Sequence, residues 1–306
     1  MEIIKDKMYE FSEWYDMILS HSDKRVDDWF LMSSPVPTLA IIMLYLLIVL
    51  VGPKIMENRE PFQLKVPMII YNFFIMALSI HTWTQCVYHM YKANYSWSCT
   101  PVKYTNDYHE LSIAAALWWY YFSKCIEMLD TVFFILRKKN NQLSFLHVYH
   151  HSTMFLLWWI GVKWVPGGQS TIGASINCFV HIIMYFYYGL SACGPQFQKY
   201  LWWKKYLTIL QLIQFFIGIA HAVQSLYFGC DFPLWMHYAL IGYATSFIVL
   251  FTNFYFHAYI RKTRQRRREK AQRLAQNGAS KGIAQKEENG AVVANGHTKV
   301  ESKKDQ

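Results

Sequence analysis

The chain has 306 residues, of which 54% are hydrophobic and 18% aromatic, while only 16% are charged. This composition is typical of a membrane protein that crosses the bilayer several times, and it argues against a soluble domain. Of the 30 Lys and Arg residues, 13 lie in residues 261–306 and account for most of the net charge of +10. Directly after a hydrophobic helix, such a tail indicates a cytosolic flank rather than a nucleic-acid-binding segment.

Residues 1–35 form a polar segment ahead of the first hydrophobic run. The first thirty residues carry eight acidic and four basic side chains and contain no short apolar core. We therefore expect no cleavable signal peptide. The apolar run that begins at Val36 is predicted to be a true membrane span.

Seven apolar segments are long enough to approach or exceed the ~20 residues that cross a bilayer. They are predicted at 36–52, 66–90, 112–136, 145–164, 170–190, 206–228 and 234–260. Pro and Gly clusters fall between these segments, as expected of loops. The sequence thus predicts an all-α polytopic membrane domain over 36–260, between an N-terminal segment 1–35 and a basic, largely disordered tail 261–306.

Loop charges predict the orientation of these spans. Three loops, 53–65, 137–144 and 191–205, carry three Lys or Arg residues each, whereas the alternate loops carry two, one and none. By the positive-inside rule the richer loops and the tail are cytosolic, and seven spans then place the N-terminus in the lumen. The basic residues of the three loops are Lys54, Arg59 and Lys65; Arg137, Lys138 and Lys139; and Lys199, Lys204 and Lys205.

Two features suit a lumenal compartment. Asn94-Tyr95-Ser96 is a glycosylation sequon in a non-cytosolic loop. Cys99 and Cys230 lie in two different non-cytosolic loops, and because that compartment is oxidising, they are the favoured disulfide pair. At the other end of the chain, Lys303 and Lys304 form a dilysine address, which predicts return to the endoplasmic reticulum.

Polar side chains recur at helical spacing within five predicted spans. Ionisable groups inside a membrane are costly, so such stripes are candidate functional sites. The polar faces of four of these spans are predicted to converge at one depth in the cytosolic half of the bilayer, which indicates an interior chamber open to the cytosol. The stripes are Lys124, Glu127, Asp130 and Thr131; His147, His150 and His151; Asn177, His181, Tyr185 and Tyr188; Thr208, Gln211, Gln214, His221 and Gln224; and Asn253 and His257.

Some of these groups have a simpler explanation. Amides and imidazoles that cross between helices commonly serve as hydrogen-bonding glue, and we favour that interpretation for His81, Gln85, His221 and Gln224. The same explanation suits the triple histidine and His181 poorly, because several imidazoles on facing helices contribute little to packing.

Three kinds of chemistry fit the segment HVYHH, residues 147–151. Histidine boxes bind iron in membrane desaturases and hydroxylases, but such sites need several boxes, and this chain has one. A neutral imidazole can instead accept an acyl group or act as a general base. A third possibility is a thiolate at Cys178, three residues before His181.

Four segments resemble the signature motifs of the ELO family of fatty acid elongases, in order over about residues 30–265. They are KCIEMLDT (124–131), HVYHH, NCFVHIIMYFYY (177–188) and TILQLIQF (208–215). The resemblance implies seven transmembrane helices, six of which ring a narrow acyl-chain tunnel. It implies condensation of a long-chain or very-long-chain acyl-CoA, saturated or polyunsaturated, with malonyl-CoA to give 3-oxoacyl-CoA, CoA and CO2. It further implies the endoplasmic reticulum membrane, no metal and no bound cofactor.

Together the residues and the resemblance assign provisional roles. His150, faced by His181, is expected to accept the acyl group, while His147 and His151 position it or remove protons. Asn177, Gln211 and Gln214 are candidate oxyanion donors. Lys124, Glu127, Asp130, Thr131, Tyr185, Tyr188 and His257 are expected to support the site. Arg137, Lys138, Lys139, Lys204 and Lys205 are candidates for CoA phosphates, although they equally satisfy the positive-inside rule.

Partners and alternatives complete these expectations. We expect oligomers with the chain itself, with other elongases or with the reductases and dehydratase of the elongation cycle, and no nucleic acid. The main alternative is a metal-dependent desaturase or hydroxylase. A receptor or transporter is less favoured, because the loops are short and the sequence contains no inverted repeat.

Overall fold

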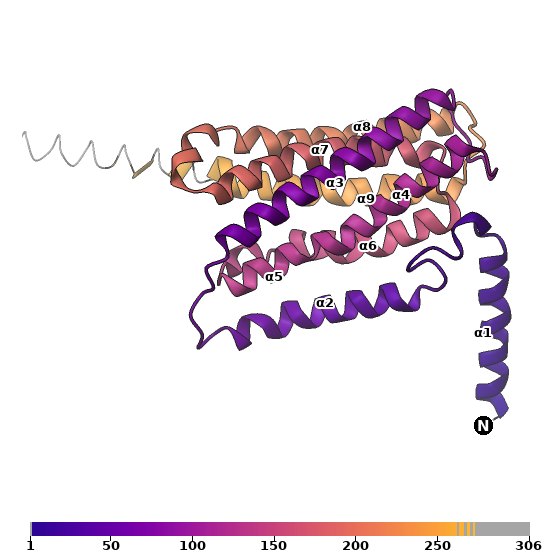
Figure 1. Ribbon diagram of the computed structural model, residues 1–306, viewed down its shortest axis with the longest axis horizontal. Coiled ribbons are helices and arrows are strands. Elements are labelled where there is room, and N and C mark those ends of the chain that lie inside the picture. Colours follow the sequence, from indigo (N-terminus) through magenta and orange to yellow (C-terminus); the bar gives the residue numbers. More distant parts are fainter. Residues whose placement is uncertain (1, 262, 266–267, 270–271, 273–306) are drawn as a thin grey trace, which may run out of the picture. The chain divides into compact units, whose positions relative to one another are not determined.

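The computed structural model describes residues 2–261, 263–265, 268–269 and 272, and this part of the chain consists of helices joined by loops, with no strand (Figure 1). The chain divides into two compact units, residues 1–251 and 252–306. The described part of the second unit comprises the end of α9, a π-helical turn at Phe256–Arg261 and a few residues beyond it. His257 belongs to this second unit, whereas Lys303 and Lys304 lie outside the described residues.

The helices α2 to α9 follow the predicted spans, with one exception described below. They are α2 (Val36–Ile55), α3 (Lys65–Lys92), α4 (Tyr108–Glu127), α5 (Leu129–Leu136), α6 (Phe145–Trp164), α7 (Gln169–Cys193), α8 (Lys204–Tyr227) and α9 (Leu234–Tyr255). Short 3-10 turns lie at Lys24–Val26, Asn140–Gln142 and Pro195–Tyr200. The sequence interpretation missed a helix in the N-terminal segment, α1 (Glu2–Ser20), because its polar residues gave no transmembrane signal.

The prediction of one continuous helical span over residues 112–136 is wrong. The span is divided at Met128 into α4 and α5. The amide of Met128 donates to the carbonyl of Cys125, and the amide of Thr131 donates to the carbonyl of Met128. These bonds span three residues instead of four, so the backbone tightens locally. Hydrophobic periodicity could not locate this break, because both helices are apolar.

Five helices are long and apolar enough to cross a membrane: α2, α3, α7, α8 and one that begins at Leu234. Their exposed faces carry large apolar side chains such as Met43 and Leu50 of α2, as expected of helices that face lipid. The helices α4 and α6 are not among the five. Helix α4 carries Lys124 and Glu127, and α6 carries the three histidines of HVYHH. These polar side chains lower the mean hydropathy of both helices.

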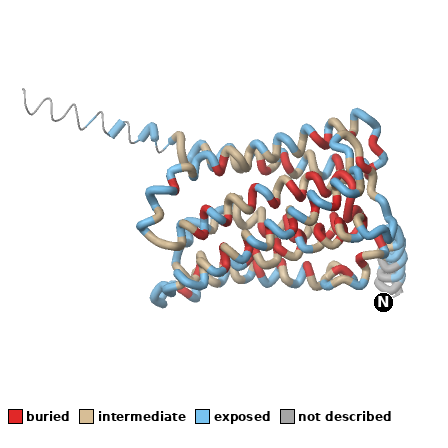
Figure 2. The backbone as a smooth tube through the Cα atoms, turned by 45° about the horizontal axis from the view of Figure 1, so that its top comes forward, coloured by how far each residue is buried: buried red, intermediate tan, exposed pale blue. Residues whose placement is uncertain are grey.

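Helix packing brings the polar stripes together. In the first unit α3 packs against α7 and α4, and α6 packs against α4 and α2. The largest core cluster combines α4 residues such as Tyr120 and Tyr121 with Phe155 and Trp159 of α6. Buried positions consequently concentrate between the helices (Figure 2).

The N-terminal segment is attached at one end of the bundle, which carries Cys99 and Cys230 and is called the disulfide end below. Lys163, at the end of α6, is buried and pairs with Asp27 at 2.6 Å. Three consecutive carbonyls of the segment, those of Phe30, Leu31 and Met32, accept hydrogen bonds from Trp118, Trp159 and Lys163 respectively.

Candidate active site

A buried ion pair lies at the centre of the site. Lys124 Nζ is 2.8 Å from Glu127 Oε1 on α4, and the two side chains are 2% and 1% exposed. The hydroxyl of Ser123 also donates to Glu127 Oε1, at 3.3 Å. Charges in a low-dielectric interior persist only when they are paired and hydrogen-bonded, so this pair sets the local electrostatics.

His181 of α7 completes the ionic cluster. Its Nδ1 lies 3.4 Å from both Lys124 Nζ and Glu127 Oε1. When Nδ1 carries the proton it donates to Glu127, and when it does not it accepts from Lys124. Either arrangement holds the ring in place and leaves Nε2 as the nitrogen available for chemistry.

The histidine box opens α6, where Ser144 caps the helix by accepting from the amide of His147. His147 Nε2 lies 2.7 Å from Thr131 Oγ1, which also meets the hydroxyl of Tyr45 at 3.1 Å. His151 is buried against the His147 ring, with centroids 4.3 Å apart. These two imidazoles are thus held by α5 and α2.

His150 points in a different direction from its neighbours in the box. Its ring contacts His181 and Phe247, with centroid distances of 6.3 and 5.7 Å. No described side chain forms a hydrogen bond with its ring nitrogens, whereas His147 and His181 both have partners. His150 is half-buried, and it is the imidazole of the box whose ring contacts His181 of the ionic cluster.

Amides line the same region. Asn177 Oδ1 accepts from the hydroxyl of Tyr120 at 2.6 Å, and Asn177 Nδ2 donates to Gln214 Oε1 at 3.3 Å. Gln211 Nε2 instead donates to the sulfur of Met184, at 3.5 Å. Of the predicted oxyanion donors, Asn177 and Gln214 are therefore linked to each other and Gln211 to a thioether.

Asp130 and Tyr185 form a second buried contact, in which the Tyr185 hydroxyl donates to Asp130 Oδ2 at 2.9 Å. Tyr185 is fully buried and its ring contacts His181. Tyr188 contacts Tyr185 ring to ring but is 38% exposed, and it lies farther out along α7. Tyr45 and Tyr120 were missed by sequence reasoning, because tyrosines at helical spacing look like ordinary core residues.

Other candidates lie apart from this cluster. Cys178 is buried within the apolar core cluster, where burial disfavours a charged thiolate. Lys138 donates to the backbone carbonyl of Glu57, and Lys139, Lys204 and Lys205 are exposed. A phosphate-binding role for these lysines and for Arg137 stays a prediction. In the described part of the chain, no three His, Cys, Asp or Glu side chains converge as metal ligands do.

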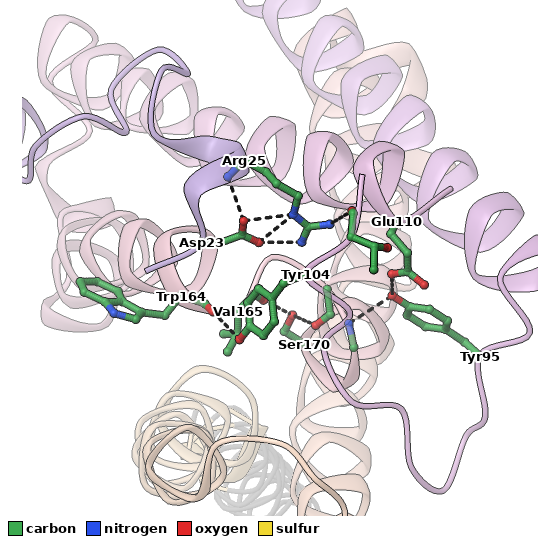
Figure 3. A network of polar contacts seen from close by, with 11 residues as sticks. Asp23, Arg25, Tyr95, Tyr104, Glu110, Trp164, Val165 and Ser170 are labelled. Carbon is green, nitrogen blue, oxygen red and sulfur yellow. Dashed lines mark hydrogen bonds and ion pairs between the residues drawn. The ribbon is translucent and has the colours of Figure 1, made fainter. Parts of the chain in front are cut away.

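The disulfide end holds a polar network that the sequence did not reveal (Figure 3). Arg25 pairs with Asp23 at 2.6 Å and donates to the carbonyl of Thr105. Tyr95 donates to Glu110 Oε2 at 2.7 Å and accepts from the amide of Gly168. Burial, and the hydrogen bond to Glu110, raise the pKa of Tyr95 above its ordinary value. This network closes the end of the bundle opposite to the histidine box.

Cys99 and Cys230, the two cysteines favoured from their predicted loops, are joined by a disulfide bond at the same end. Asn94 of the sequon is exposed just after α3. Of the residues assigned to interhelical glue, His81 packs edge-on against Trp119 and His221 packs against Trp97. They lie outside the ionic cluster.

The helical bundle and its histidine–lysine cluster define a membrane-embedded enzyme class, and comparison with known families agrees with it. The model of the ELO: GNS1/SUR4 family matches residues 30–267, and the chain belongs to this family. It is 53% identical over 296 residues to "Very long chain fatty acid elongase 4" of Homo sapiens, covering 97% of this chain and 93% of the relative. It is 55% identical over 293 residues to the protein of that name from Mus musculus, covering 94% and 93%. "Very long chain fatty acid elongase 7" of Rattus norvegicus is 46% identical over 255 residues, covering 82% and 90%.

Proposed function

We propose that this protein is a very long chain fatty acid elongase, the enzyme that condenses an acyl-CoA with malonyl-CoA. The observation that carries the proposal is the position of His150, whose ring faces His181 beside the buried Lys124–Glu127 pair. Family membership and the printed names of its relatives support the same activity.

The first half-reaction transfers the acyl group to the enzyme. A ring nitrogen of His150 attacks the thioester carbon, the carbon–sulfur bond breaks, and CoA leaves as a thiol after taking up a proton. His181 is placed to receive the proton that His150 loses, because its Nδ1 is already held by the ionic cluster. The product is an acyl-imidazole, which remains an activated acyl donor.

The second half-reaction forms the carbon–carbon bond. Malonyl-CoA loses CO2, and the resulting enolate attacks the acyl carbon held on His150. The bond between carbon and imidazole nitrogen breaks, His150 takes up a proton from water, and 3-oxoacyl-CoA is released. Oxyanions develop in both halves, and the amide hydrogens near Asn177 and Gln214 are suited to stabilise them.

The membrane arrangement extends this proposal. Seven spans follow if α4 with α5 and α6 also cross the bilayer, with the acyl chain housed between the helices. The three basic loops then lie in the cytosol, and the disulfide end lies in the lumen of the endoplasmic reticulum. The exposed sequon residue Asn94 supports this orientation, and its glycosylation in microsomes tests it. Oligomers, within the family or with the other enzymes of elongation, are expected in that membrane.

Two measurements test the activity. Purified protein given radiolabelled malonyl-CoA and a long-chain acyl-CoA should release labelled 3-oxoacyl-CoA. Protein given acyl-CoA alone should gain the mass of one acyl group on the peptide that contains His150, and His150→Ala should abolish both signals. Absence of labelled product from wild-type protein overturns the proposed function. Full activity in His150→Ala overturns only the role of this residue.

A further inference from the structure

We infer that Tyr120 is a positioning residue, which fixes the orientation of the Asn177 and Gln214 amides and holds the Lys124 ammonium. The inference rests on the proposed condensing activity and adds a residue of α4 that the family motifs quoted above do not contain. It is carried by three contacts of one side chain.

The first contact sets the direction of a hydrogen-bond chain. The Tyr120 hydroxyl donates to Asn177 Oδ1 at 2.6 Å, so the amide nitrogen of Asn177 faces the other way and donates to Gln214 Oε1. Because the oxygens of both amides accept hydrogen bonds, the donors left over are the second hydrogen of Asn177 Nδ2 and the two hydrogens of Gln214 Nε2. Hydrogen bonds in such a chain also polarise one another.

The second contact lies on the face of the same ring. Lys124 Nζ is 4.5 Å from the ring centroid of Tyr120, one helical turn earlier on α4. The ammonium is therefore held between the π-face of Tyr120 and the carboxylate of Glu127. Tyr120 thus meets Lys124 through its ring and Asn177 through its hydroxyl.

The third contact makes the tyrosine rigid. Tyr120 is 2% exposed, and its ring packs edge-on against Trp158 of α6 with centroids 4.4 Å apart. A rigid ring can position other groups without a conformational cost at the moment of reaction. Buried tyrosines commonly serve packing alone, so the test must separate the hydroxyl from the ring.

Tyr120→Phe makes this separation, because it keeps the ring, the contact with Trp158 and the contact with Lys124. We expect its kcat to fall about tenfold or more, with KM for both substrates changed less than about twofold, since a positioning group acts mainly in the transition state. The neighbouring residue offers a matched control. Tyr121 is fully buried, stacks on Phe155, and its hydroxyl bonds to Thr38 of α2 instead of an active-site amide. Tyr121→Phe should lose similar thermal stability but keep kcat within about twofold.

A double-mutant cycle completes the experiment. If Tyr120 acts through Asn177, then Tyr120→Phe in an Asn177→Ala background lowers kcat by less than about twofold further. Wild-type kcat in Tyr120→Phe, or an equal loss of kcat in Tyr121→Phe, overturns the inference while wild-type protein still condenses. Full additivity in the double variant also overturns it. A wild-type protein without condensing activity would instead refute the proposed function itself.

Discussion

Lys124 and Glu127 form an ion pair one helical turn apart, at 2.8 Å, in which neither side chain is more than 2% exposed. The same two groups hold Nδ1 of His181 from both sides. A helix that carries two charges inward can exist in a membrane only because the charges meet each other before they meet lipid. The pair therefore serves folding and the site together.

Replacing one partner of this ion pair should lower the stability of the protein more than replacing both partners. Lys124→Met leaves Glu127 buried without its partner, and we expect a loss of about 3–5 kcal/mol in stability. The double variant Lys124→Met with Glu127→Gln should unfold at a higher temperature than the single variant, although both lack activity. Thermal unfolding in detergent measures the difference. Lys24→Met, at the exposed pair with Asp27, should change stability by no more than about 0.5 kcal/mol. Equal melting temperatures for the single and double variants would contradict the expectation.

Thr131→Val should impair the histidine box without altering its histidines. The substitution preserves shape but removes the hydroxyl that meets His147 Nε2 and the Tyr45 hydroxyl. We expect kcat to fall by about ten- to a hundredfold, because His147 loses the partner that sets its tautomer. Thr153→Val is the control. Thr153 lies on α6, as the histidine box does, but its hydroxyl forms a hydrogen bond with Tyr243 and not with a histidine of the box. Condensing activity of Thr131→Val equal to that of Thr153→Val would show that Thr131 does not position the imidazole.

Asp107 is the N-cap of α4, and its carboxylate makes the stability of the first turn of this helix depend on pH. Its carboxylate accepts from the amides of His109 and Glu110, and these hydrogen bonds lower the pKa of Asp107 below its usual 3.8. A lowered pKa in the folded state means that the stabilisation is fully present above the unfolded value and is lost as pH falls through the folded one.

Asp107→Asn retains an N-cap that does not titrate, and therefore isolates this effect. The melting temperature of wild-type protein relative to Asp107→Asn should be constant above about pH 5 and should decline below about pH 4. Unfolding scans between pH 3 and pH 7 provide the comparison. A relative melting temperature that rises on acidification would give the opposite sign and reject the capping role.

The bond between Cys99 and Cys230 should dominate the stability of its end of the bundle. It joins residues 131 positions apart, and a cross-link over a loop of this length contributes on the order of 2–5 kcal/mol. Cys99→Ser, Cys230→Ser and the double variant should all melt lower than wild type and by similar amounts. Cys193→Ser, at a free half-buried cysteine, should melt like wild type. An unchanged melting temperature in the double variant would contradict this assignment.

Local patterns predicted most of the helices, because hydropathy and spacing depend only on neighbouring residues. The span predicted at 145–164 coincides with α6, and the favoured cysteines proved to be the bonded ones. Motif spacing also placed Lys124 with Glu127 on one face of a helix. The break at Met128 escaped prediction because it changes backbone hydrogen bonds without changing hydropathy.

The identity of the polar stripes was determined by the sequence alone, whereas their partners were decided only by tertiary structure. A periodic pattern shows which face of a helix is polar, but the helix that faces it depends on packing across the whole bundle. Thus His147 meets Thr131, while Asn177 meets Tyr120 and Gln214. Likewise, the three histidines of the box look alike in sequence, and only the tertiary structure shows that the His150 ring contacts His181 of α7 whereas His147 meets Thr131 of α5.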